Sequence, residues 1–240
     1  ITTILFDLDG TLLPMDQELF VKTYFKALTA RVAPLGYEPQ ALLDAVWAGT
    51  AAMVKNPGTC TNEEVFWNFF AKQFGERVRD DIPVFEDFYR NEFQQAQKVC
   101  GYNPKAREAV EFARSLGFRV ILATNPLFPS IATESRIRWA GLEPEDFEFY
   151  TTYENSNHCK PNPAYYQDIL TRAQVKPEEC LMVGNDTTED LAAATLGISV
   201  FLQTDCLINQ KSVDISQYPH GDFDALINYL SSLKNSKAEQ

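Results

Sequence analysis

The fold is decided by a short stretch near the start of the 240-residue chain, Thr3-Ile4-Leu5-Phe6-Asp7-Leu8-Asp9-Gly10-Thr11. Residues 3–6 are apolar or β-branched and do not alternate with polar residues, which is typical of a strand buried on both faces of a parallel sheet. Gly10 marks a turn directly after it. The stretch therefore predicts a buried strand that ends on polar residues.

Two carboxylates, Asp7 and Asp9, stand two residues apart just after this strand. At a separation of about 4 Å and an effective dielectric near 20, their repulsion is on the order of 4 kcal/mol. A bound Mg²⁺, which prefers oxygen ligands, would offset that repulsion. The alternative is an acidic turn in which Asp9 only accepts backbone hydrogen bonds.

The rest of the chain divides into a helical part and an alternating part. Residues 14–101 have helical spacing of apolar residues and no convincing strand, with helices expected from about residue 16 and over 39–55, 62–74 and 82–99. After residue 103, helices over 104–116, 129–140, 163–173, 189–196 and 223–233 alternate with strands over 118–123, 147–151, 180–183 and 198–202. This order predicts an α/β fold with a parallel sheet and an inserted helical segment, and ligands bind at the carboxyl ends of such strands.

Polar residues follow the later strands as well. Thr124 and Asn125 follow the strand over 118–123, Lys160 precedes a helix, and Asn185-Asp186 opens an acidic cluster after the strand over 180–183. Taken singly, each has an ordinary explanation: a helix cap for Thr124, a solvated surface group for Lys160, and acidic first-turn residues for the cluster. Their common position at strand ends favours a shared site.

Taken together and in order, the motifs resemble the four motifs of the haloacid dehalogenase superfamily. The matching segments are Asp7-x-Asp9-x-Thr11, Thr124-Asn125, Lys160-Pro161 and Gly184-Asn185-Asp186-xxx-Asp190. The resemblance implies a Rossmann-like α/β core formed by residues 1–14 and 102–240, and an all-α cap of the C1 type formed by residues 15–101. One departure is Asn185, which follows Gly184 where many members have aspartate.

The resemblance also implies a role for each matching residue. Asp7 would be the nucleophile that forms an aspartyl-phosphate, Asp9 the general acid and base, and Thr124 and Lys160 the groups that neutralise the transferring phosphoryl group. The expected substrate-binding residues are Thr11, Thr124, Asn125 and Lys160. The expected Mg²⁺ ligands are Asp7, Asp9 through its main-chain carbonyl, Asp186 and Asp190, with Asn185 less favoured.

These roles predict a Mg²⁺-dependent phosphatase that hydrolyses a small phosphorylated metabolite. A phosphoglucomutase-like phosphotransferase would keep the same motifs, and a non-catalytic binding module is a further alternative. Dehalogenases of the superfamily are disfavoured because their typical members lack a carboxylate at the position of Asp9. Most aromatic residues of the insert are expected to form its own core, with a few in 14–24 or 47–55 facing the crevice.

Composition and charge limit the partners and the cellular compartment that we expect. The formal net charge of −12 and the pI of about 4.6 argue against nucleic acid or an anionic membrane as a partner. No apolar stretch approaches the length of a membrane span, and the apolar start reaches Asp7 too soon for a signal peptide. Five scattered cysteines without a CxxC pair suit reduced thiols. We therefore expect a cytoplasmic protein that is a monomer or a weak homodimer.

Overall fold

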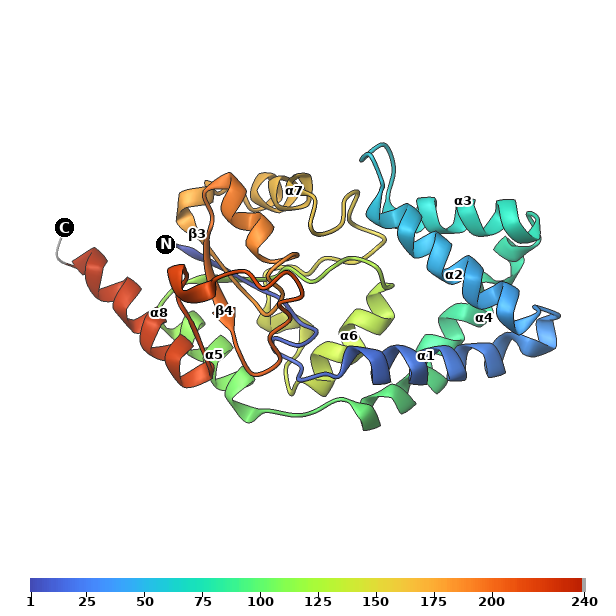
Figure 1. The fold of residues 1–240 in the computed structure, drawn as a ribbon, viewed down its shortest axis with the longest axis horizontal. Coiled ribbons are helices and arrows are strands. Elements are labelled where there is room, and N and C mark those ends of the chain that lie inside the picture. The colour runs from blue at the N-terminus through green and yellow to red at the C-terminus, as the bar shows by residue number, and fades with distance from the viewer. Residues whose placement is uncertain (239–240) are drawn as a thin grey trace.

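A five-stranded, wholly parallel sheet forms the centre of the α/β part of the chain. The computed structural model describes residues 1–238, so the last two residues of the predicted core lie outside the described residues. The strands are β1 (Thr3–Phe6), β2 (Arg119–Leu122), β3 (Cys180–Gly184), β4 (Ser199–Gln203) and β5 (His220–Gly221). They are arranged in the order β2-β1-β3-β4-β5 (Figure 1). The predicted α/β fold with a Rossmann-like parallel sheet is thus confirmed.

Helices cover both faces of this sheet because alternate residues of a strand point to opposite sides. Ile4 and Phe6 belong to one apolar cluster, together with residues of α5 (Pro104–Ser115) and α8 (Phe223–Ala238). Leu5 belongs to a second cluster, with α7 (Pro163–Ala173) and the 3₁₀-helix η5 (Leu191–Leu196). β1 is therefore buried on both faces, as its apolar sequence predicts.

A helical insert, residues 15–101, lies to one side of the α/β part (Figure 1, right). Its elements are α1 (Gln17–Val32), η1 (Ala33–Leu35), α2 (Pro39–Val54), α3 (Asn62–Phe74), α4 (Val78–Arg90) and η2 (Glu92–Val99). Its two ends meet, since Gly101 donates a backbone hydrogen bond to the Pro14 carbonyl at 2.7 Å and Met15 forms an antiparallel bridge with Cys100. The chain therefore enters and leaves the insert at one place, between Pro14 and Gly101, here termed the neck.

Asn62 makes a further connection between the insert and the α/β part. Its side chain is fully buried, and its amide nitrogen lies 3.3 Å from the Pro126 carbonyl and 3.2 Å from Cys159 Sγ. The backbone N–H of Asn62 also donates to the Ser156 carbonyl at 2.9 Å. The start of α3 is therefore docked against the loop that leads to Lys160.

Three predicted elements differ from the structure. The helix expected over 82–99 is two elements, α4 and η2, because the backbone changes direction at Asn91, whose side-chain amide donates to the Asp87 carbonyl. Residues 147–151 run beside β2 but form one isolated bridge, Tyr150 with Leu122, rather than a strand. The helix expected over 189–196 is the short η5, because aspartate side chains nearby bind backbone N–H groups.

The remaining elements are short, apart from α6. They are α6 (Ser130–Trp139), η3 (Pro144–Asp146), η4 (Pro177–Glu179) and η6 (Ile215–Gln217). The two-residue β5 at the sheet edge is absent from the predicted elements, since it is too short to give a periodic signal. Among residues 1–238, no helix combines the length and hydropathy of a membrane-spanning segment.

Candidate active site

Asp7 lies where β1 ends, and the turn after it is built around a glycine. The Asp7 N–H donates to the Val183 carbonyl at 2.9 Å, which continues the sheet by one residue and places Asp7 beside the end of β3. Gly10 has a φ of +85°, and a Cβ there would lie 2.3 Å from Asn185 Nδ2. Glycine is thus required both by the backbone and by the close approach of Asn185.

A buried ammonium group joins two carboxylates at this point. Lys160 Nζ lies 2.9 Å from Asp7 Oδ1 and 2.7 Å from Asp190 Oδ1, and its side chain is fully buried. Burial by itself would lower the pKa of Lys160, but Asp190 and Asp7 raise it well above its ordinary value. Burial raises the pKa of Asp7, and the ammonium of Lys160 opposes that shift. Lys160 therefore favours the ionised form of Asp7.

The other oxygen of Asp7 is held by a hydroxyl. Thr11 Oγ1 lies 3.0 Å from Asp7 Oδ2 and 3.1 Å from Asn185 Oδ1, so it can donate to either oxygen. Asn185 in turn donates through Nδ2 to the Cys206 carbonyl at 2.7 Å. The amide of Asn185 is thus oriented by neighbours on both sides.

The two aspartates of the fourth motif are placed differently. Both oxygens of Asp190 are engaged, one by Lys160 and the other by the Asp186 N–H at 2.9 Å. Asp186 accepts hydrogen bonds from Thr188 and Glu189 N–H groups through Oδ1 and lines the cavity in front of Asp7. The geometry favours Asp186 over Asp190 as a residue that meets a ligand, and Asp190 as the partner that fixes Lys160.

Thr124 and Asn125 lie at the end of β2, on the far side of Asp7 from β3. Thr124 is buried and lines the same cavity, while its carbonyl accepts hydrogen bonds from Thr151 Oγ1 and the Tyr165 hydroxyl. Asn125 donates through Nδ2 to Glu189 Oε1 at 2.9 Å. The predicted residues after β1, β2 and β3 are therefore brought to one edge of the sheet.

Glu189 is a further acidic residue at this edge to which the sequence assigns no role. Burial, opposed in part by Lys160, raises the pKa of Glu189 to about 8. A carboxyl group in such a setting is a candidate for contact with a ligand. Its signal in the sequence is weak, because an acidic residue in the first turn of a helix is common on electrostatic grounds alone.

Asp9 is paired with Arg136, which the sequence analysis does not identify. The Arg136 guanidinium forms an ion pair with Asp9 Oδ2, is completely buried, and stacks 4.5 Å from the Phe128 ring centroid. Asp9 Oδ1 has no hydrogen-bond partner among the described residues. One signal could have revealed Arg136: it falls on the apolar side of α6, four residues from both Ala132 and Ala140.

These residues surround a cavity of about 260 Å³, here termed the catalytic cavity. Five carboxylic acids line it, namely Asp7, Asp9, Asp186, Glu189 and Asp190. The insert contributes its other side through residues that include Phe20, Val21 and Trp47. Because Lys160 and Arg136 lie behind the carboxylates and not in the lining, an anionic ligand entering this cavity would meet a negative surface.

The donor set fits a hard cation such as Mg²⁺. The lining offers carboxylate and amide oxygens, and two buried acceptors, Asp9 Oδ1 and Asn125 Oδ1, have no partner among residues 1–238. Within the described part of the chain no three His, Cys, Asp or Glu side chains form a ready cluster for a metal. Mg²⁺ does not need one, since it usually keeps several waters and uses one or two carboxylates together with substrate phosphate.

The fold and the acidic strand-end site define a class of hydrolase, and sequence comparison identifies the family. A model of the haloacid dehalogenase-like hydrolase family matches residues 1–196. The chain therefore belongs to the haloacid dehalogenase-like hydrolase family, which confirms the predicted resemblance, and it is an enzyme of that class.

Two kinds of curated relative illustrate the similarity. The chain is 27% identical over 202 residues to a phosphoglycolate phosphatase of Vibrio vulnificus, covering 84% of this chain and 82% of the relative. It is 25% identical over 187 residues to the pyrophosphatase PpaX of Bacillus cereus, covering 78% of this chain and 75% of the relative. Both relatives are thus matched over most of their length.

Solved structures agree in fold. A 2-haloacid dehalogenase from Pseudomonas syringae has a TM-score of 0.63 and 20% identity, covering 97% of this chain and 99% of that one. A phosphatase of the same family from Thermococcus onnurineus has a TM-score of 0.59 and 18% identity, covering 97% and 98%. At these identities the likeness establishes the fold alone.

Replacing Arg136 tests the importance of its ion pair with Asp9. Arg136→Met leaves a largely buried carboxylate without its cation, so we expect the free energy of unfolding to fall by about 3 kcal/mol or more. Arg138→Met on the same helix is the matched control: Arg138 is half exposed and its contacts with Glu134 and Glu143 should contribute about 0.5 kcal/mol or less. Equal losses in urea titrations of the two variants would contradict the interpretation.

Proposed function

We propose that this enzyme is a Mg²⁺-dependent phosphatase that hydrolyses a small phosphorylated metabolite through an aspartyl-phosphate on Asp7. Its family is that of the haloacid dehalogenase-like hydrolases, and the curated relatives are named as phosphatases, which supports a phosphohydrolase activity. The observation that carries the finer proposal is the buried Lys160 between Asp7 and Asp190, at the end of β1 and beside an acidic cavity.

Asp7 supplies the nucleophile. A carboxylate needs no partner base, but it must be ionised, and burial disfavours that form. The ammonium of Lys160 at 2.9 Å opposes the effect of burial. Asp7 then attacks phosphorus, the bond between phosphorus and the leaving oxygen breaks, and a phosphoryl group remains on the carboxylate. Lys160 is in this account the group that keeps Asp7 reactive at neutral pH.

Asp9 acts as the proton carrier. Arg136 holds Asp9 Oδ2 in an ion pair, whereas Oδ1 has no hydrogen-bond partner among the described residues, so Oδ1 is available to remove a proton from the water that hydrolyses the aspartyl-phosphate. For the first half of the reaction it must instead donate a proton to the leaving oxygen. We assign Arg136 the role of positioning Asp9 for both proton transfers.

Magnesium would be held by Asp7, Asp186 and the main-chain carbonyl of Asp9, with Asn185 oriented too firmly by Thr11 and Cys206 to be the favoured ligand. When bound, Mg²⁺ neutralises charge on the transferring phosphoryl group and offsets the five lining acids. Thr124 and Asn125 lie where they can donate to phosphoryl oxygens, and Thr11 holds the nucleophile. Asp190 fixes Lys160.

The helical insert is proposed to be a cap. Residues 15–101 join residues 1–14 and 102–240 at the neck between Pro14 and Gly101, and they supply one wall of the catalytic cavity. A cavity of about 260 Å³ suits a small substrate. Closure over the site would exclude water that does not take part in the reaction.

Removing the nucleophile is the direct test. Asp7→Asn should lower kcat for phosphate release from a phosphomonoester by at least about 1,000-fold, because an amide is a far poorer nucleophile toward phosphorus than a carboxylate. Thermal midpoint and far-UV circular dichroism should stay close to wild type, and Asp224→Asn, at an exposed position in α8, should keep full activity. A folded Asp7→Asn enzyme with most of its activity would rule the mechanism out.

Metal removal tests the cofactor and separates the alternatives. Treatment with a chelator should abolish phosphate release, and added Mg²⁺ should restore it, because the acids of the cavity otherwise repel the substrate dianion. Free phosphate rather than an isomeric sugar phosphate is expected as product, which distinguishes a phosphatase from a mutase. Full activity in the chelated protein would contradict the assignment of Mg²⁺.

A further inference from the structure

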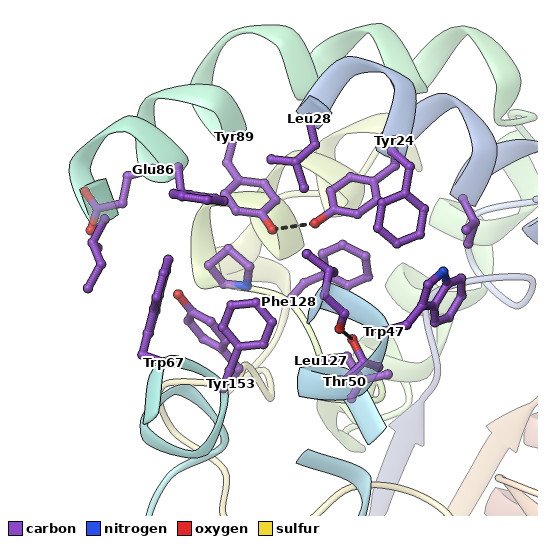
Figure 2. A pocket seen from close by; sticks show the side chains of 17 residues that line it. Tyr24, Leu28, Trp47, Thr50, Trp67, Glu86, Tyr89, Leu127, Phe128 and Tyr153 are labelled. Atoms are coloured by element: carbon purple, nitrogen blue, oxygen red, sulfur yellow. Dashed lines mark hydrogen bonds between the residues drawn. The ribbon is translucent and has the colours of Figure 1, made fainter. Parts of the chain in front are cut away.

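A second cavity, here termed the aromatic cavity, lies between the helical insert and the loop that follows β2 (Figure 2). Its volume is about 160 Å³. Aromatic and aliphatic side chains make up nearly all of its lining, among them Tyr24, Trp67 and Tyr89 from the insert and Phe128 and Tyr153 from the α/β part. The catalytic residues are absent from this lining.

The two cavities adjoin each other. Val21, Trp47, Leu127 and Phe128 line both of them. Leu127 and Phe128 come soon after Thr124 and Asn125, so the same loop carries residues of the catalytic cavity and the wall of the aromatic one. Trp47 is about half exposed and stands at this junction. A ligand whose phosphate lies at Asp7 would therefore extend its remaining atoms toward the aromatic cavity.

Most polar groups of the aromatic cavity are engaged within the protein, apart from Trp67 Nε1, which is buried without a hydrogen-bond partner among the described residues. The hydroxyls of Tyr24 and Tyr89 bind each other at 3.0 Å, as Figure 2 shows, and Thr50 donates to the Val46 carbonyl at 2.9 Å. Glu86 is exposed and paired with Arg90. With most of these groups satisfied within the protein, the walls favour a largely apolar occupant, because a polar ligand would lose its water and gain few partners.

The linings of the two cavities argue against a substrate with a second anionic group besides its phosphate. Neither cavity has a lysine, arginine or histidine among its lining residues. A substrate carboxylate or a second phosphate would be taken from water without a cation to pair with. Substrates such as phosphoglycolate and pyrophosphate, after which the curated relatives are named, carry such a group. The remainder of the substrate of this enzyme must then be uncharged.

Size and shape narrow the choice further. An apolar protein cavity of roughly 150 Å³ accommodates one benzene ring, and the aromatic cavity has about this volume. Its walls include several aromatic rings, against which a flat ring can pack edge to face. We propose that the aromatic cavity takes an uncharged, ring-sized apolar group, so that the substrate is a phosphate monoester of an alcohol bearing one aromatic ring. The inference rests on the proposed phosphatase function.

The test compares benzyl phosphate with methyl phosphate, since the two alcohols are similar in acidity and differ mainly in the ring. Wild-type enzyme should show a kcat/KM for benzyl phosphate that is higher by about 10-fold or more, from burial of the ring. Phosphoglycolate should be hydrolysed less efficiently than benzyl phosphate. Cyclohexylmethyl phosphate separates aromatic packing from apolar burial. Equal kcat/KM values for benzyl and methyl phosphate would overturn the proposal.

Variants of α2 test whether the preference for benzyl over methyl phosphate arises in the aromatic cavity. Thr50→Phe places a ring in the aromatic cavity and should reduce the benzyl-to-methyl ratio of kcat/KM to near one. Ala51→Phe introduces the same side chain at the neighbouring, exposed position and should keep the wild-type ratio. Trp47→Ala removes a half-exposed wall residue and should also lower the ratio. An unchanged ratio in both Thr50→Phe and Trp47→Ala would contradict the proposal.

A binding measurement separates this inference from the proposed function. Calorimetric titration with benzylphosphonate and methylphosphonate in the presence of Mg²⁺ does not depend on turnover. Tighter binding of benzylphosphonate by about 10-fold, lost in Thr50→Phe, would support the cavity assignment. Equal affinities would overturn it. Absence of hydrolysis of every ester, together with the difference in binding, would count against the phosphatase proposal and not against the cavity.

Discussion

The ion pairs of one buried lysine hold the candidate site together. Lys160 contributes a positive charge that is out of contact with water and lies within 2.9 Å of both Asp7 and Asp190. An unpaired ammonium or carboxylate in that position would carry a large desolvation cost. The two carboxylates stabilise the ammonium of Lys160, and Lys160 in turn favours the ionised form of Asp7. Gly184 makes the arrangement possible, because a Cβ there would collide with the Asp190 carboxylate at 2.1 Å. The reactivity proposed for Asp7 depends on this cluster.

The same constraint explains why the cavity needs a cation and why the rest of the substrate is expected to be neutral. Lys160 and Arg136 are consumed by Asp7, Asp190 and Asp9, which leaves the cavity lined by acids and without a basic side chain. A phosphate dianion can approach only with a divalent cation, whereas a second anionic group has nothing to pair with. The helical insert then supplies an apolar space directly beside the phosphate position. The catalytic cavity thus binds the phosphate through charge, and the aromatic cavity binds the rest of the same ligand through burial of apolar surface.

Much of this arrangement could be predicted from the sequence, for a topological reason. Asp7, Thr124 and Asn185 each follow a strand, and parallel strands bring their carboxyl ends to one edge, so order along the chain was enough to place them together. Arg136 and Glu189 were not predicted as site residues, because their side chains reach the site from α6 and from the start of a helical turn, where arginine and glutamate are common. The helix expected over 189–196 was wrong because the Asp186 and Asp190 carboxylates accept hydrogen bonds from backbone N–H groups, which competes with helix formation. Which aromatic residues of the insert face a cavity depends on packing between segments far apart in sequence, and helical periodicity does not report it.

The central claim is that Asp7, whose ionised form is favoured by Lys160, takes the phosphoryl group from substrate. The most direct measurement is mass spectrometry of the peptide that contains Asp7 after the enzyme, mixed with Mg²⁺ and a phosphomonoester, is quenched in acid within a single turnover. We predict one added phosphoryl group on Asp7 in the wild-type enzyme, and none in the Lys160→Met variant at neutral pH. A rapidly hydrolysing wild-type enzyme whose Asp7 peptide stays unmodified at every quench time, or one that carries the phosphoryl group on another residue, would contradict it.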